Sequence, residues 1–164
     1  MLRLIHIFGA VMFLGGIMSD LVWMAFAQRT KRPANLAISS RTVTLNDFFV
    51  VLPGAGILLL SGFPMILASA EVSQLPLFEA LLKSLQVGWL IVSFVMFNVS
   101  GMIWLFLALP CQRRLAAIAE QNTHSESLPD EFYSLLNNWY LWSGAATVTP
   151  LIALILMVLK PSMW

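Results

Sequence analysis

Long apolar stretches alternate with short polar segments along this chain. Four stretches, at about residues 4–27, 48–68, 87–109 and 139–159, carry few charges. A helix of that length crosses the ~30 Å hydrocarbon layer of a bilayer. Lipid offers the backbone no hydrogen-bond partner, so these stretches are expected to be helices packed against one another. The pattern predicts an all-α fold, an integral membrane four-helix bundle that forms one domain over residues 1–164.

The connecting segments carry helical patterns of their own. Residues 76–85 place leucine and phenylalanine at helical spacing and predict a short helix on the outer surface of the bilayer. Residues 112–121 are expected to extend the third membrane helix. Pro129, followed by two acidic residues, predicts that the fourth helix begins there.

Composition agrees with a membrane location. Of the 164 residues, 59% are hydrophobic and 10% are charged, against about 25% charged in soluble domains. The net charge is +1 and no basic stripe is present, which argues against nucleic-acid binding. The single cysteine, Cys111, cannot form a disulfide within the chain, and no zinc-binding spacing occurs.

Basic residues favour one orientation. Those in the first and third connections are Arg29, Lys31, Arg32, Arg41, Arg113 and Arg114, and those on the other side are Arg3, Lys83 and Lys160. The positive-inside rule then predicts cytoplasmic first and third connections and two outward-facing termini. Trp104 and Trp139 are expected near the inner boundary, where amphipathic rings favour the headgroup level.

The first apolar stretch holds two ionisable residues, His6 and Asp20. Such groups are costly inside a membrane and are functional candidates by default. Fourteen residues separate them, which is ~21 Å along a helix with an angular offset of about 40°. They are therefore expected on one face, at opposite membrane boundaries. That face also carries Gly9 and Gly16.

His6 and its surroundings allow several interpretations. Gly9 either permits close approach of another helix or leaves a flat slot beside His6 for a planar cofactor. The imidazole of His6 suits the iron of haem b or a copper ion, or it bonds a neighbouring carbonyl or water. Met65 and Met157 lie at a similar depth and are candidate second ligands, although methionine is more often flexible filler.

A second polar group is expected at the inner boundary. Asp20 either pairs with a cation of the first connection, such as Arg29 or Arg41, or relays protons. Asp47 suits the N-terminus of the second helix. Asp20, Arg41 and Asp47 together would form a network that handles protons or holds a quinone headgroup.

Several segments carry a family resemblance. They are "LRLIHIFGAVMFLGGIMSD", "RTVTLNDFFVVLPGAGILLLSGF", "GWLIVSFVMFNVSGMIWLFLALPCQRRL" and "LNNWYLWSGAATVTPLIALILMVLKP". Together they resemble a bacterial family of predicted four-helix integral membrane proteins of unknown function. The resemblance implies a multi-pass protein of the bacterial inner membrane.

The first helix has a more distant likeness. "LIHIFGAVMFLGG" is similar to the first helix of CopD-like copper-resistance proteins and of the haem-containing membrane protoporphyrinogen oxidase of bacteria. This likeness implies that His6 is the position of a haem or metal ligand. The chain holds no second histidine inside an apolar stretch.

These observations predict a haem b-binding redox protein with His6 as axial ligand. One alternative is a non-enzymatic accessory subunit of a larger membrane complex, or a homo-oligomer. Another is a CopD-like copper-handling protein. No phosphate loop, zinc-protease motif or paired-carboxylate motif is present, and the sequence leaves open whether the chain is an enzyme.

Overall fold

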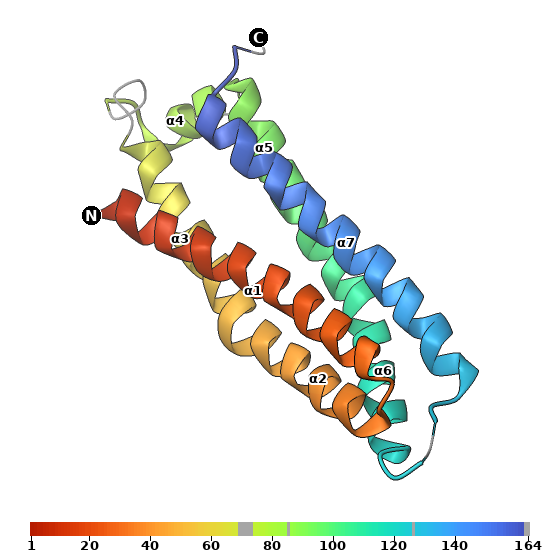
Figure 1. Cartoon of the computed structure of the whole chain (residues 1–164). Coiled ribbons are helices and arrows are strands. Elements are labelled where there is room, and N and C mark those ends of the chain that lie inside the picture. The colour runs from red at the N-terminus through yellow and green to blue at the C-terminus, as the bar shows by residue number, and fades with distance from the viewer. Residues whose placement is uncertain (69–73, 85, 126, 163–164) are drawn as a thin grey trace.

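The computed structural model describes residues 1–68, 74–84, 86–125 and 127–162 of the chain, and all regular structure in these residues is helical (Figure 1). This confirms the all-α fold of an integral membrane bundle. The helices are α1 (Leu2–Thr30), α2 (Pro33–Asn46), the π-helix η1 (Asp47–Val51), α3 (Leu52–Leu67), α4 (Leu77–Ser84), α5 (Gly88–Ile103), the π-helix η2 (Trp104–Ala108), α6 (Leu109–Gln121) and α7 (Asp130–Leu159).

Several of these helices join end to end into long rods. Within the described residues, four helices are long and apolar enough to cross a membrane: Leu2–Thr30, Pro33–Leu67, Gly88–Gln121 and Asp130–Leu159. The second consists of α2, η1 and α3, and the third of α5, η2 and α6. Both chain termini and α4 lie at one end of the bundle, called here the terminal end (Figure 1). The opposite end, with the α1–α2 turn, is called the turn end.

The first connection is much shorter than the sequence pattern predicts. It consists of Lys31 and Arg32, since residues 33–46 form α2. Lys31 ends α1 in the left-handed conformation with φ 51°, and Pro33 starts α2 at a position where its missing N–H costs nothing. Hydropathy alone misses α2 because this helix is mixed in character. It buries Leu36 and Val43 but exposes Arg41.

Other predicted helices are present. α4 lies within the predicted 76–85 segment, whose residue 85 falls outside the described residues. α6 continues the third rod to Gln121, and α7 begins at Asp130 directly after Pro129.

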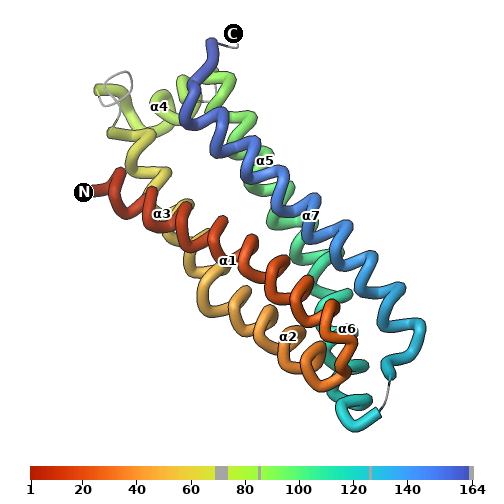
Figure 2. Tube along the Cα trace, viewed as in Figure 1, coloured from red at the N-terminus to blue at the C-terminus, as the bar shows by residue number. Residues whose placement is uncertain are grey.

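The four rods form two pairs. α1 packs along α3, and α5 packs along α7, whereas α2 against α6 and α1 against α7 join the pairs. Figures 1 and 2 show the pairs together at the turn end and separating toward the terminal end. The largest apolar cluster lies at the turn end and includes Met24, Leu115, Phe132 and Trp139. Trp139 is 1% exposed, so it is a core residue and not part of a headgroup belt.

Glycines let α1 and α3 approach closely. A Cβ atom added at Gly54 of α3 would lie 2.7 Å from the backbone nitrogen of Phe13 in α1. One added at Gly9 of α1 would lie 2.8 Å from the Ile57 side chain. Small residues serve this purpose in membrane bundles, and here they fix α1 against the rod that carries Asp47.

The two π-helices have matching sequence contexts. η1 is followed by Leu52 and Pro53, and η2 by Leu109 and Pro110. Proline cannot donate to the carbonyl four residues earlier and crowds it. The turn before each proline widens to the π pattern. π-Helices are rare in proteins overall, and those that occur are often found at functional sites. The first residues of η1 and η2, Asp47 and Trp104, are joined by a hydrogen bond.

Candidate functional site

A group of buried polar side chains connects the two helix pairs. Asp20 on α1 is 5% exposed and Asp47 on η1 is 4% exposed. Asn46 lies between α1 and the second rod. Its Nδ2 donates to Asp20 Oδ1 at 2.8 Å and to the carbonyl oxygen of Gly16 at 3.0 Å. Asn46 therefore holds Asp20 against the second rod.

The third and fourth rods bind the other carboxyl group. Asp47 Oδ2 accepts hydrogen bonds from Gln112 Nε2 at 2.8 Å and from Trp104 Nε1 at 3.2 Å. Gln112 also donates to Thr44 Oγ1 at 3.2 Å and accepts from Trp139 Nε1 at 3.3 Å. Each rod contributes at least one member. The polar network is defined as Asp20, Thr44, Asn46, Asp47, Trp104, Gln112 and Trp139.

Asp20 and Asp47, called here the carboxyl pair, lie within hydrogen-bonding reach of each other. Among the described residues, neither forms an ion pair with a lysine or arginine. The expected Asp20 ion pair is therefore replaced by the bond from Asn46. Arg41 is exposed on α2 and does not join the pair. Two facing carboxylates repel each other unless a proton lies between them, so this arrangement is suited to holding and releasing a proton.

A central cavity of about 560 Å³ adjoins the network. Its polar border includes Asp20, Asp47, Gln112 and Arg113. Most of its remaining wall is apolar. The apolar and small residues include Phe13, Ile17, Phe48, Val51, Leu52, Ala55, Leu59, Phe97, Leu105 and Leu109. Cavities of about 300–1,000 Å³ with apolar walls and a few polar groups are the usual form of small-molecule sites.

Aromatic contacts between the two helix pairs line the cavity. The rings of Phe13 and Phe97 have centroids 5.3 Å apart, and those of Phe48 and Trp104 lie 6.5 Å apart. Both contacts span the gap between one pair and the other. The polar border and the aromatic rings therefore meet around a single space.

His6 lies outside this cavity, on the α1–α3 contact nearer the terminal end. Its Nδ1 is 3.0 Å from Ser61 Oγ. The Ser61 hydroxyl donates to the Ile57 carbonyl at 2.5 Å, so the Ser61 oxygen is left to accept from His6 Nδ1–H. That assignment places the lone pair of the imidazole on Nε2, the arrangement typical of metal-bound histidines.

The other residues predicted around His6 have separate positions. Gly62 lies against the ring, since an added Cβ would be 3.1 Å from His6 Cε1. The space beside Gly9 is filled by Ile57 of α3. Met65 is one helical turn beyond Ser61 on α3, while Met157 is on α7, and both are half-buried. The described residues contain no group of three or more His, Cys, Asp or Glu side chains arranged to hold a metal ion.

A family comparison identifies the class of protein. The family model "Predicted integral membrane protein (DUF2269)" matches residues 1–161. The chain belongs to this family. Membership agrees with the four membrane-length helices. Comparisons with curated proteins and with solved structures gave no match.

Five members of the polar network are not predicted as site residues by the sequence: Thr44, Asn46, Trp104, Gln112 and Trp139. Gln112 lies in a segment with the pattern of an ordinary polar helix extension, and the two tryptophans fit a headgroup belt. The sequence has four Leu-Pro steps, and the two that lie in or at the end of an apolar stretch, Leu52-Pro53 and Leu109-Pro110, each directly follow a π-helix. Both π-helices border the cavity, and the first residue of each belongs to the network.

Proposed function

We propose that this membrane protein binds a small amphipathic redox carrier of the quinone class in the central cavity. The carboxyl pair would hydrogen-bond the bound ring, and it would give or take up protons when an electron-transfer partner of the protein reduces the quinone or oxidises the quinol. The observation that supports this most directly is the position of two buried carboxyl groups on the border of a mainly apolar cavity of about 560 Å³, with no cation partner in the part of the chain that the structure describes. The proposed setting is the bacterial inner membrane, with both termini outward.

The chemistry of the ligand follows from the cavity wall. A quinone has an apolar ring face and carbonyl oxygens that accept hydrogen bonds, whereas the quinol has hydroxyl groups that donate them. A protonated carboxyl group donates to the first form, and a carboxylate accepts from the second. Asp20 and Asp47 can therefore bind either form, depending on which of them holds the proton.

Tryptophan fluorescence gives a direct binding test. Trp104 and Trp139 line the cavity, so a bound quinone is expected to quench them saturably. Decylubiquinone would be titrated into protein in mild detergent, with Asp20→Asn as the site variant and Asp130→Asn, an exposed acid at the start of α7, as control. We expect Asp20→Asn to weaken saturable quenching about tenfold or more. Linear quenching that is equal in all three proteins would exclude the site.

A second readout reports proton exchange. The carbonyl stretch of a protonated carboxyl group appears in an infrared difference spectrum when its hydrogen bonds change. Quinone binding is expected to shift such a band in the wild type and in Asp130→Asn, but not in Asp20→Asn. If quinone binds but no carboxyl band changes, the cavity would still be a quinone site. The proposal that the carboxyl pair handles protons would then be wrong.

Haem b at His6 is the second candidate, and one observation favours it. Ser61 leaves the Nε2 lone pair of His6 for an iron or copper ion. A bound haem would supply one-electron chemistry, and Met65 or Met157 would be the second ligand.

The absorbance spectrum of protein made with haem available tests this candidate. We expect a Soret band that is lost in His6→Ala and kept in His124→Ala, the only other histidine. A colourless wild type would exclude haem. Elemental analysis would then test whether the protein binds copper. A partner protein that stays bound during purification in mild detergent would indicate an accessory subunit.

A further inference from the structure

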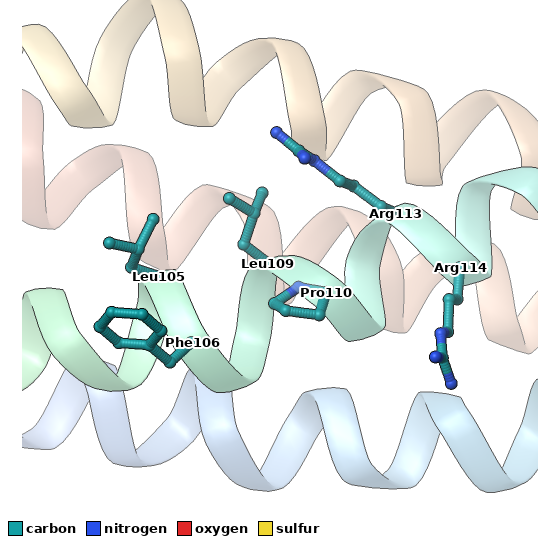
Figure 3. Close-up of a pocket in the computed structure, with 6 residues that line it drawn as sticks. All are labelled: Leu105, Phe106, Leu109, Pro110, Arg113 and Arg114. Atoms are coloured by element: carbon teal, nitrogen blue, oxygen red, sulfur yellow. The ribbon is translucent and has the colours of Figure 1, made fainter.

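A second cavity lies on the outside of the third rod. It is a groove of about 540 Å³ at the junction of η2 and α6. Four apolar residues and two arginines line it: Leu105, Phe106, Leu109, Pro110, Arg113 and Arg114 (Figure 3). In this view Arg113 extends back past Leu109, on the same side of the helix as Leu105, whereas Arg114 points to the opposite side (Figure 3).

The groove and the central cavity have a common wall. Leu105, Leu109 and Arg113 line both. They are four residues apart, which places them in one row along the helix. Leu105 is 47% exposed and Arg113 is also exposed, although Leu109 is 6% exposed. This row of side chains therefore borders both the inner and the outer space.

The wall begins beside the carboxyl pair. Leu105 directly follows Trp104, whose indole N–H bonds Asp47. A ring bound beside Asp47 would therefore lie next to Trp104, and the following residue, Leu105, already lines the groove. The groove opens at the outside of the third rod, where Phe106 is 61% exposed and faces the surroundings of the bundle.

We propose that the ligand of the central cavity carries a long apolar tail, which passes between Leu105, Leu109 and Arg113 and lies in the outer groove. This inference rests on the proposed function and defines its ligand as a tailed quinone, of the isoprenoid or alkyl type. The polar ring occupies the cavity at the network. The tail contacts Phe106 and Pro110 and continues into the bilayer, so the ligand reaches its site from the lipid without crossing water.

Photo-crosslinking locates the tail. The probe is decylubiquinone with a diazirine in the first part of its alkyl tail, and adducts are mapped by mass spectrometry of the purified protein. Excess tailless dimethoxy-methyl-benzoquinone competes for the ring site and separates specific adducts from those made by random contact with lipid-facing residues. We expect competable adducts to concentrate on residues 105–110.

Matched variants test the groove. Phe106→Ala shortens an exposed side chain of the groove that does not line the central cavity, and Phe94→Ala makes the same change at a residue of α5 with 55% exposure that lines neither cavity. Phe106→Ala is expected to reduce competable adducts on Pro110 at least twofold while tailless quinone still quenches the cavity tryptophans. Phe94→Ala is expected to leave both measurements unchanged.

The outcomes separate the two proposals. Competable adducts on another wall of the cavity, such as Ala55 or Leu59 of α3, would overturn the tail path while leaving the quinone site in place. The complete absence of competable adducts, together with no saturable quenching by the tailless quinone, would overturn the quinone site itself.

Discussion

Gln112 and Asp47 are joined by a hydrogen bond of 2.8 Å, from the Nε2 of Gln112 to the Oδ2 of Asp47, although they are 65 residues apart in the sequence. The bond links α6 to η1 and so connects the two rods that contain π-helices. Gln112 is 1% exposed and also binds Thr44 and Trp139. One amide side chain therefore ties three of the four rods together beside the cavity.

Replacing this amide is expected to destabilise the bundle. Gln112→Met keeps a similar volume but leaves Trp139 Nε1 without its acceptor and Asp47 with one donor fewer. Buried polar groups that lose a partner cost about 1–3 kcal/mol, so the free energy of unfolding in mild detergent should fall by that amount. Gln121→Met is the control because Gln121 is exposed at the end of the same helix. Equal unfolding midpoints for the two variants would show that the network adds nothing to stability.

The acceptor role of Asp47 can be separated from its charge. Asp47→Ala removes the acceptor for both Trp104 Nε1 and Gln112 Nε2, and a loss of about 1–3 kcal/mol is expected. Asp47→Asn keeps one side-chain oxygen and removes the repulsion from Asp20, so it should retain most of the stability. Chemical unfolding of both variants makes the comparison. If Asp47→Asn unfolds as readily as Asp47→Ala, the hydrogen bonds are not what makes Asp47 important for the fold.

Much of the fold follows from features that are local in sequence. Apolar length marks the four membrane rods, and helical spacing on α1 correctly places His6 and Asp20 on one side of the helix, toward α3 and η1. Asp20 and Asp47 lie within hydrogen-bonding reach of each other, whereas Arg41, the third residue of the predicted network, is exposed on α2. The extra length of the second rod escapes prediction because α2 is mixed in character and is stabilised by packing against α1 and α6, which no hydropathy window measures.

The partners of the carboxyl pair depend on contacts between distant segments. Gln112 looks like a polar residue beyond the membrane boundary until α6 is packed against η1. Trp104 looks like a headgroup anchor until its indole N–H is aimed at Asp47. Arg41 looks like the natural partner of Asp20, but its position on α2 directs it outward. Such pairings are decided by the way the rods rotate against each other, which one sequence leaves undetermined.

The glycine contact between α1 and α3 gives a prediction with an internal control. In Gly54→Ala the new Cβ would meet the Phe13 backbone at 2.7 Å, and a backbone atom cannot turn away as a side chain can. A loss of about 1–3 kcal/mol is expected, as for other overpacked sites. Gly56 lies on the same helix, and a Cβ added there would have nothing within 4 Å, so Gly56→Ala should be neutral or stabilising by about 0.5–1 kcal/mol. Thermal unfolding of the two variants in one detergent tests the contact, and similar losses in both would contradict it.

The orientation in the membrane can be measured with single cysteines. Arg29, Arg32 and Arg113 lie at the turn end, which holds six of the nine basic residues in the chain, and basic connections favour the cytoplasm. In a Cys111→Ala background, Ser162→Cys is placed at the terminal end and Ser125→Cys at the turn end, and both positions are exposed. A maleimide that does not cross membranes should label Ser162→Cys in intact bacteria, but should label Ser125→Cys only after the inner membrane is opened. The reverse pattern would place the carboxyl pair nearer the outer face, and its protons would then be exchanged with that side.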